Sequence, residues 1–87
     1  MPIRLLEKSS PTYKRRLARE IQENKHKGIY YQREGQKFRV IGARYSDGFL
    51  RVKINTPAGW ERVRDENLDN FTDGNGREVC ASREIRQ

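Results

Sequence analysis

The sequence predicts an α+β domain in which an N-terminal helix packs on a small, strongly curved antiparallel sheet of four or five strands. Two observations predict it. Apolar side chains recur at helical spacing between residues 11 and 27, and short segments between residues 29 and 64 alternate apolar with polar side chains. Because 33% of the 87 residues are hydrophobic and 36% are charged, the chain provides one thin core and one domain at most.

The helix has clear start and stop signals. Ser10 is suited to cap the free backbone N–H groups, and Pro11 is tolerated at the first helical position. The apolar side chains of the helix form one narrow stripe: Tyr13, Leu17 and Ile21, with Ala18 at its edge. Gly28 favours a left-handed stop, so we expect the helix to end near Lys27.

Four strands are expected after the helix: residues 29–32, 37–43, 49–54 and 60–64. Gly35 and the pair Asp47-Gly48 favour tight turns between the first three strands. Gly42 lies inside the second strand, where a glycine indicates a bulge or a sharp bend.

Three further segments complete the chain: a flexible arm over residues 1–9, a short helical turn over residues 65–71, and a flexible, acidic-to-mixed tail over residues 72–87. The helical turn is expected to place Leu68 and Phe71 on the core. For residues 78–81 a short fifth strand is the alternative to a disordered tail. The helix-plus-sheet domain is therefore expected to span residues 10–71.

Alternation in the central strands separates two faces of the sheet. The face expected to turn inward is mostly aliphatic: Phe38, Val40, Leu50, Val52, Ile54, Glu61 and Val63. The opposite face is expected to contact solvent, and we call it the wet face. It carries six of the seven Lys and Arg residues between positions 37 and 64: Lys37, Arg39, Arg51, Lys53, Arg62 and Arg64. Ile41, Phe49 and Trp60 lie among these cations. A register slip after the loop at Pro57 would instead turn Trp60 inward.

The excess of positive charge predicts a polyanionic partner. The formal net charge is +7, and the cations concentrate in the helix and the sheet, whereas residues 65–87 hold three cations and six anions. Cations on the wet face neutralise phosphates, and rings among them stack on unpaired bases. We therefore predict binding of RNA or single-stranded DNA through ten residues: Lys37, Arg39, Phe49, Arg51, Lys53, Trp60, Arg62 and Arg64 on the sheet, and Arg15 and Arg19 on the helix.

Part of the expected sheet resembles a known kind of small domain. Residues 35–42 (Gly-Gln-Lys-Phe-Arg-Val-Ile-Gly) and 48–52 (Gly-Phe-Leu-Arg-Val) place alternating aliphatic side chains between glycines. This pattern resembles the strand pair of SH3-like barrels of the KOW and Tudor kind, although the spacing between the glycines departs from the usual KOW pattern. The resemblance covers about a third of the chain. It implies an SH3-like barrel and a role in binding RNA, DNA or protein.

Enzyme and metalloprotein classes find no support in the sequence. Cys80 is the only cysteine and His26 the only histidine, so a structural zinc site lacks ligands and Cys80 lacks a disulfide partner. No glycine-rich phosphate loop follows an apolar strand, and no segment has the apolar length of a signal peptide or a membrane span. We expect a non-enzymatic cytoplasmic protein without a cofactor.

Other interpretations fit the same residues. In one interpretation the chain is an adaptor or inhibitor, of the kind that phages encode as regulators, and it docks on an acidic surface of a nucleic-acid enzyme. In another it is a subunit of a larger assembly. Tyr30, Tyr31 and Trp60 could also form an aromatic cage for a methylated cation, as in Tudor-like domains. Charge on the wet face also keeps a protein soluble, but solvation alone would mix acids with the cations, and this face has none.

Overall fold

The structure is a computed structural model that describes residues 3–5, 10–79 and 84–86. Its elements in chain order are β1 (Ile3–Leu5), α1 (Pro11–Asn24), the 3-10 helix η1 (Lys25–Lys27), β2 (Ile29–Arg33), β3 (Gln36–Ser46), β4 (Phe49–Ile54), β5 (Trp60–Arg62), the 3-10 helix η2 (Asp65–Asn67), β6 (Phe71–Asp73) and β7 (Glu84–Arg86). One α-helix and an antiparallel sheet confirm the predicted α+β class. None of the described helices is long and apolar enough to cross a membrane.

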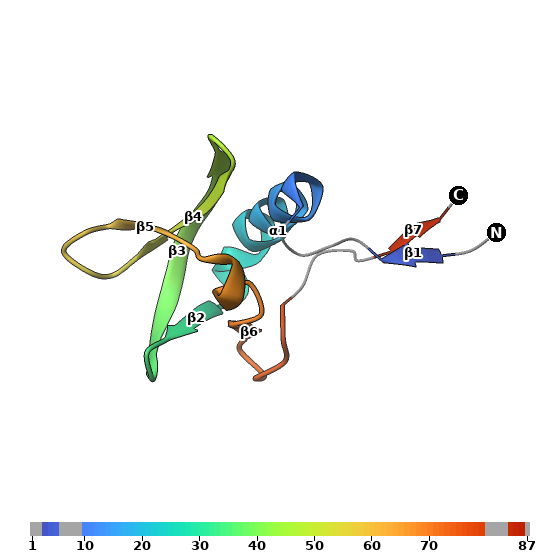
Figure 1. The fold of residues 1–87 in the computed structure, drawn as a ribbon. Coiled ribbons are helices and arrows are strands. Elements are labelled where there is room, and N and C mark those ends of the chain that lie inside the picture. Colours follow the sequence, from blue (N-terminus) through green and yellow to red (C-terminus); the bar gives the residue numbers. More distant parts are fainter. Residues whose placement is uncertain (1–2, 6–9, 80–83, 87) are drawn as a thin grey trace.

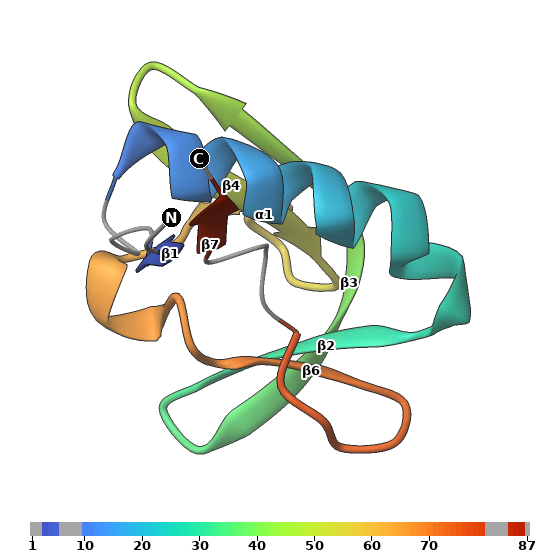
Figure 2. The ribbon, with the colours of Figure 1, turned by 90° about the vertical axis from the view of Figure 1, so that its right-hand side faces the viewer.

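Five antiparallel strands form the main sheet in the order β5-β4-β3-β2-β6, and α1 packs on one side of it (Figures 1 and 2). Within the described residues, β5 and β6 at the two ends of this order do not pair with each other. The sheet is therefore open and does not close into a barrel. β1 and β7 form a separate two-stranded antiparallel sheet, which lies apart from the main sheet in Figure 1.

β3 is the long strand that joins the two halves of the main sheet. Its residues 36–39 pair with β2, and from Val40 onward it pairs with β4. The register shifts between Val40 and Gly42, which confirms the irregularity that the sequence predicts at Gly42. Positive φ angles at both hairpin turns match the predicted turns: Glu34 and Gly35, then Asp47 and Gly48.

The helix begins where the sequence predicts. The Ser10 hydroxyl accepts a hydrogen bond from the Tyr13 backbone N–H at 3.1 Å, and Pro11 occupies the first turn. After Asn24 the chain tightens into η1 before Gly28 adopts a φ of +94°, a value that favours glycine. The helical segment thus reaches the predicted end, but its last turn is a 3-10 turn.

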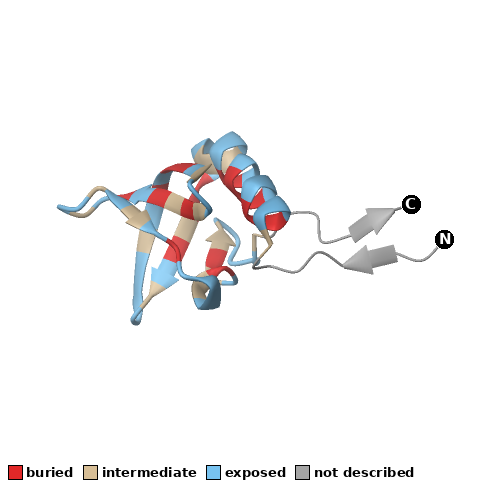
Figure 3. Cartoon of the chain, turned by 45° about the horizontal axis from the view of Figure 1, so that its top comes forward, coloured by how far each residue is buried: buried red, intermediate tan, exposed pale blue. Residues whose placement is uncertain are grey.

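The core lies between α1 and the inner face of the sheet, where buried residues face each other (Figure 3). The helix contributes Tyr13, Leu17, Ala18 and Ile21. The rest of the chain contributes Ile29, Tyr31, Val40, Ala43, Leu50, Val52, Ile54, Val63, Leu68 and Phe71. The predicted inward face is therefore confirmed at its aliphatic positions, while Phe38 and Glu61 are only half-buried.

The fifth strand of the main sheet is β6, which follows η2 and pairs with β2. The alternative expected from the sequence places a fifth strand at residues 78–81, of which the structure describes only residues 78 and 79. Glu78 forms an isolated bridge with Thr72. The Asp73 carboxylate accepts hydrogen bonds from the backbone N–H groups of Asn75 and Arg77 at 2.8 and 3.0 Å. Residues 78 and 79 therefore return to the sheet, where the Val79 N–H bonds to the Phe71 carbonyl and the Val79 side chain packs against the core, while residues 74–77 are exposed.

Both chain ends contain a strand that the sequence analysis did not predict. β1 lies in the segment expected to be a flexible arm, and β7 lies in the segment expected to be a flexible tail. The fourth predicted strand, residues 60–64, is shorter than expected, because β5 ends at Arg62 and η2 begins at Asp65. The short helical turn predicted in that region is confirmed as η2.

Candidate nucleic-acid interface

Cations and two aromatic rings occupy the positions of β3, β4 and β5 that alternate with buried residues of the sheet. We call the surface that they form the basic face and define it by seven residues of β3, β4, β5 and the segment after β5: Arg44, Phe49, Arg51, Lys53, Trp60, Arg62 and Arg64. Trp60 is 37% exposed, and Phe49 and Arg51 are half-buried among their neighbours. The predicted alternation is therefore confirmed in β4 and β5, and no register slip turns Trp60 inward.

Three arginines of the basic face stand side by side across three strands. Arg44 lies directly opposite Arg51 in the β3–β4 ladder, and Arg51 lies directly opposite Arg62 in the β4–β5 ladder. Because neighbouring strands are about 4.8 Å apart, the three side chains leave the sheet within about 10 Å of one another. Like charges in such positions repel each other. These residues, which we call the arginine row, concentrate positive charge.

Arg44 is the member of the arginine row that the sequence analysis missed. Counted in steps of two from Lys37, Arg44 falls on the inward face. The bulge next to Gly42 adds one residue to β3 and reverses the alternation beyond it, so that Ala43 is buried and Arg44 is exposed. In the sequence, Gly42 indicates that the strand is irregular here. It does not show where the extra residue lies, and Arg44 can be assigned to the outer face only when the bulge is known to lie between Val40 and Arg44.

Two aromatic rings hold the guanidinium groups of the arginine row. The Arg62 guanidinium lies 4.1 Å from the centre of the Phe49 ring, and that of Arg51 lies 5.8 Å from the same centre. The Arg44 guanidinium lies 4.6 Å from the centre of the Trp60 ring. Each such contact is worth about 0.5–1 kcal/mol at an exposed site and restricts the orientation of the guanidinium plane. The arginine row is therefore ordered by the protein itself.

No described carboxylate forms an ion pair with the arginine row. Arg64, just beyond the row, pairs with the exposed Glu66 at 3.7 Å. Arg51 instead donates hydrogen bonds to the hydroxyl and the backbone carbonyl of Ser46 at 2.6 and 3.3 Å. The charge of the row is thus not neutralised within the described part of the chain.

Lys37 and Arg39 extend the cationic surface along the other half of β3. Both are exposed and lie before the bulge, where β3 pairs with β2 rather than with β4. Arg39 lies opposite Tyr30, and the Lys37 ammonium lies 5.4 Å from the centre of the Tyr30 ring. These two predicted residues therefore form a second cation–aromatic group rather than part of the arginine row.

Arg15 and Arg19 lie on α1, which covers the opposite side of the sheet. Both are exposed, and the Arg15 guanidinium lies 5.2 Å from the centre of the Tyr45 ring. One helical turn beyond Arg19, the Gln22 side chain accepts a hydrogen bond from the Ala43 backbone N–H at 3.0 Å. Arg15, Arg19 and Gln22 share one side of the helix, so these contacts place that side along β3. The structure therefore puts both helix cations at the border of the sheet and not on the basic face.

The structure contradicts the alternative prediction that Tyr30, Tyr31 and Trp60 form an aromatic cage for a methylated cation. Tyr31 is fully buried and stacks on Phe71 with ring centres 4.9 Å apart, whereas Trp60 lies on the outer face. The two rings therefore cannot enclose one ligand. Among the described residues, no group of three or more metal-ligating side chains comes together, and Cys80 lies outside these residues.

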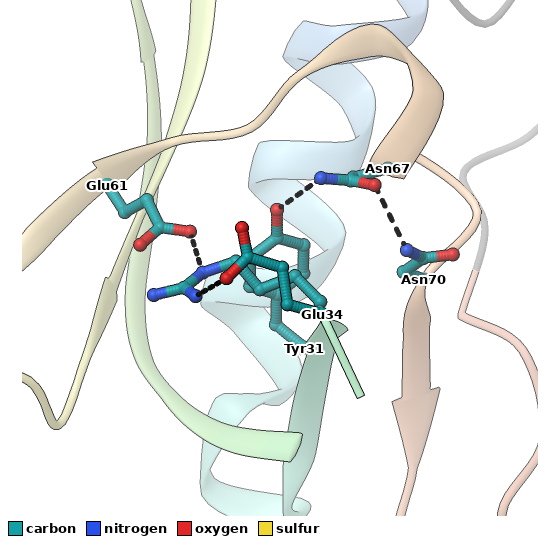
Figure 4. A network of polar contacts seen from close by, with 6 residues as sticks. Tyr31, Glu34, Glu61, Asn67 and Asn70 are labelled. Carbon is teal, nitrogen blue, oxygen red and sulfur yellow. Dashed lines mark hydrogen bonds and ion pairs between the residues drawn. The ribbon is translucent and has the colours of Figure 1, made fainter. Parts of the chain in front are cut away.

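A polar cluster lies between β2, β5 and η2 (Figure 4). Arg33 on β2 donates to Glu61 on β5 in a half-buried ion pair, and this hydrogen bond raises the pKa of Arg33. Asn67 donates to the Tyr31 hydroxyl at 3.2 Å and accepts from Asn70 at 3.2 Å. Burial raises the pKa of the Tyr31 phenol above 10.0, and the nearby Glu61 carboxylate raises it further, although the bond from Asn67 lowers it. All of these side chains except that of Asn70 line a cavity of about 600 Å³.

No protein-family model matches the chain, and no curated protein or solved structure is significantly similar to it. The fold and its surface therefore define the class of protein. It is a small α+β domain with a cationic and aromatic sheet face on one side and a polar cavity at the sheet margin.

Proposed function

We propose that this protein is a small, non-enzymatic nucleic-acid-binding domain that holds RNA or single-stranded DNA across the basic face. The observation that carries this proposal is the arginine row. Its three guanidinium groups stand opposite one another, stack on rings and have no described carboxylate partner. Repulsion within the row costs folding free energy, and a strand of phosphates relieves that repulsion on binding.

The exposed ring of Trp60 favours single strands over duplexes. It lies opposite Lys53 in the β4–β5 ladder and beside the arginine row. Unpaired bases stack on such rings with about 1–3 kcal/mol each, whereas the base faces of a duplex are covered by their neighbours. Phosphate contacts and stacking carry little base information, so these residues alone give loose sequence preference.

An SH3-like architecture belongs to the same proposal. Support comes from the order of the five strands and from the bulge that lets β3 pair with β2 at one end and with β4 at the other. The Arg33–Glu61 ion pair links β2 to β5, the strand at one end of the sheet order. The domain is then a small barrel left open at its margin.

The proposal is tested with fluorescently labelled single- and double-stranded oligonucleotides. Replacing Trp60 by Ala should weaken single-strand binding by about 1–3 kcal/mol per lost stacked base and change duplex binding less. The variant should still fold, because Trp60 is 37% exposed. Ile41→Ala is the matched control, since Ile41 is a 49% exposed apolar residue on the neighbouring part of β3 and has no ring. Equal affinities for wild type, Trp60→Ala and Arg62→Gln would refute the assignment.

An acidic protein surface is the alternative ligand, because carboxylates pair with guanidinium groups as phosphates do. A pull-down from lysate with and without nuclease distinguishes the two. Partners that disappear after nuclease treatment support the nucleic-acid proposal. A stoichiometric protein partner that persists, and that is lost in Arg51→Gln, would replace it with an adaptor or inhibitor role.

A further inference from the structure

The cavity between β2, β5 and η2 adjoins the basic face through shared residues. Arg62, a member of the arginine row, lines this cavity together with Arg64. The volume of the cavity, about 600 Å³, lies within the range of about 300–1,000 Å³ typical of small-ligand sites. A strand of nucleic acid that follows the row from β3 to β5 therefore reaches the cavity at β5.

The polar groups in the cavity are held in place but retain hydrogen-bonding capacity. Arg33 stacks on the Phe38 ring at 4.9 Å, and its Nε and Nη1 atoms bond to Glu61 and Glu34. Within the described residues these hydrogen bonds use Nε and Nη1 of Arg33 and Oε2 of Glu61, which leaves Nη2 of Arg33 and Oε1 of Glu61 for a ligand. The side chains of Arg33 and Glu61 are only 22% and 23% exposed.

The charges of the cavity favour a nucleobase over a phosphate group. Its lining holds three arginines and three glutamates: Arg33, Arg62, Arg64, Glu34, Glu61 and Glu66. A phosphate drawn to the arginines would be repelled by the carboxylates at similar distance. A neutral base instead presents donors to the carboxylates and acceptors to the guanidinium groups, which leaves neither set unpaired.

We propose that this cavity is a subsite for one guanine base of the strand bound on the basic face, an inference that rests on the proposed function. Guanine carries two adjacent donors, N1–H and N2–H, which suit the two oxygens of the Glu61 carboxylate. Its O6 atom is an acceptor for the free Nη2 of Arg33. The other bases lack this pair of adjacent donors, so they would leave part of the ion pair unsatisfied. The subsite adds base preference to a face that otherwise reads only charge and stacking.

The test compares labelled U-octamers with octamers that carry one guanosine at each position in turn. Wild type should bind the best-placed guanosine octamer about tenfold more tightly than the U-octamer. Glu61→Gln should lose this preference while keeping its affinity for the U-octamer, because the arginine row is unchanged. Glu34→Gln is the matched control, since it alters a carboxylate of the same cavity that is 84% exposed, and it should keep the preference.

The outcomes separate the subsite from the proposed function. Equal binding of all octamers by wild type, or a retained preference in Glu61→Gln, overturns the subsite and leaves the basic face intact. Failure of wild type to bind any octamer overturns the proposed function as well. An independent measurement needs no variant: guanosine monophosphate should shift the NMR signal of the Arg33 Nε–H group, and uridine monophosphate should not. Equal shifts with both nucleotides would contradict the assignment to guanine.

Discussion

Replacing Arg44 by Gln tests the arginine row at the residue that only the structure assigns to it. Each phosphate contact contributes about −0.7 to the slope of log affinity against log salt concentration for single strands. Three contacts give a slope of about −2.1, and Arg44→Gln should bring it to about −1.4. Between 50 and 200 mM salt the row then accounts for an affinity loss of about 18-fold in wild type and about 7-fold in the variant.

The assay is a salt titration of fluorescence anisotropy with a labelled single-stranded oligonucleotide. Arg44→Lys keeps the charge and loses the stacking on Trp60, so its slope should stay near the wild-type value. Arg16→Gln removes the same charge from an exposed position on α1 and should leave the slope unchanged. If Arg16→Gln and Arg44→Gln flattened the slope equally, total charge rather than the arginine row would control binding, and the reasoning would fail.

Three further predictions concern stability and are checked by urea unfolding. Ser10→Ala should cost about 1 kcal/mol, because the cap on the Tyr13 N–H is lost. Gly42→Ala should raise stability by about 0.4–1 kcal/mol, since the added Cβ meets its nearest neighbour, in Trp60, at an ordinary 3.5 Å; a loss would show that the bulge requires glycine. Burial raises the pKa of Tyr31, so Tyr31 contributes stability that is complete below pH 10.0 and is lost as the pH rises through its folded-state pKa. Tyr31→Phe should therefore flatten the alkaline decline in stability, and an unchanged decline would contradict this contribution.

The local elements of the fold were predictable because their causes lie within a few residues of the chain. Ser10 caps the helix by bonding a group three residues away, and the turn at Asp47-Gly48 needs positive φ at adjacent positions. The bounds of β4 match the predicted strand, residues 49–54, and its alternation correctly exposes Lys53 and buries Leu50. Steric preference, near-neighbour hydrogen bonds and the two-residue period of a strand determine these features.

The cavity and the edges of the sheet depend on residues far apart in the chain. Arg33 and Glu61 are 28 positions apart, and nothing in either local pattern indicates their pairing. β6 was not predicted because its three residues, Phe71–Asp73, are too few to show alternation, and its place beside β2 depends on how η2 turns the chain. Such contacts join surfaces that only the complete tertiary structure brings together.

The sequence by itself determined the α+β class, the helix with its cap, the main turns and a cationic face that exposes Trp60. Only the tertiary structure decided that Arg44 completes the arginine row and that Arg15 and Arg19 lie outside it. Arg15 and Arg19 lie outside the row because α1 packs along β3. The physical reason for the place of Arg44 is the bulge next to Gly42, because one extra residue in β3 reverses the side to which every later side chain of that strand points. Strand pairing sets the place of that extra residue, and pairing depends on the partner strand β4 as much as on β3.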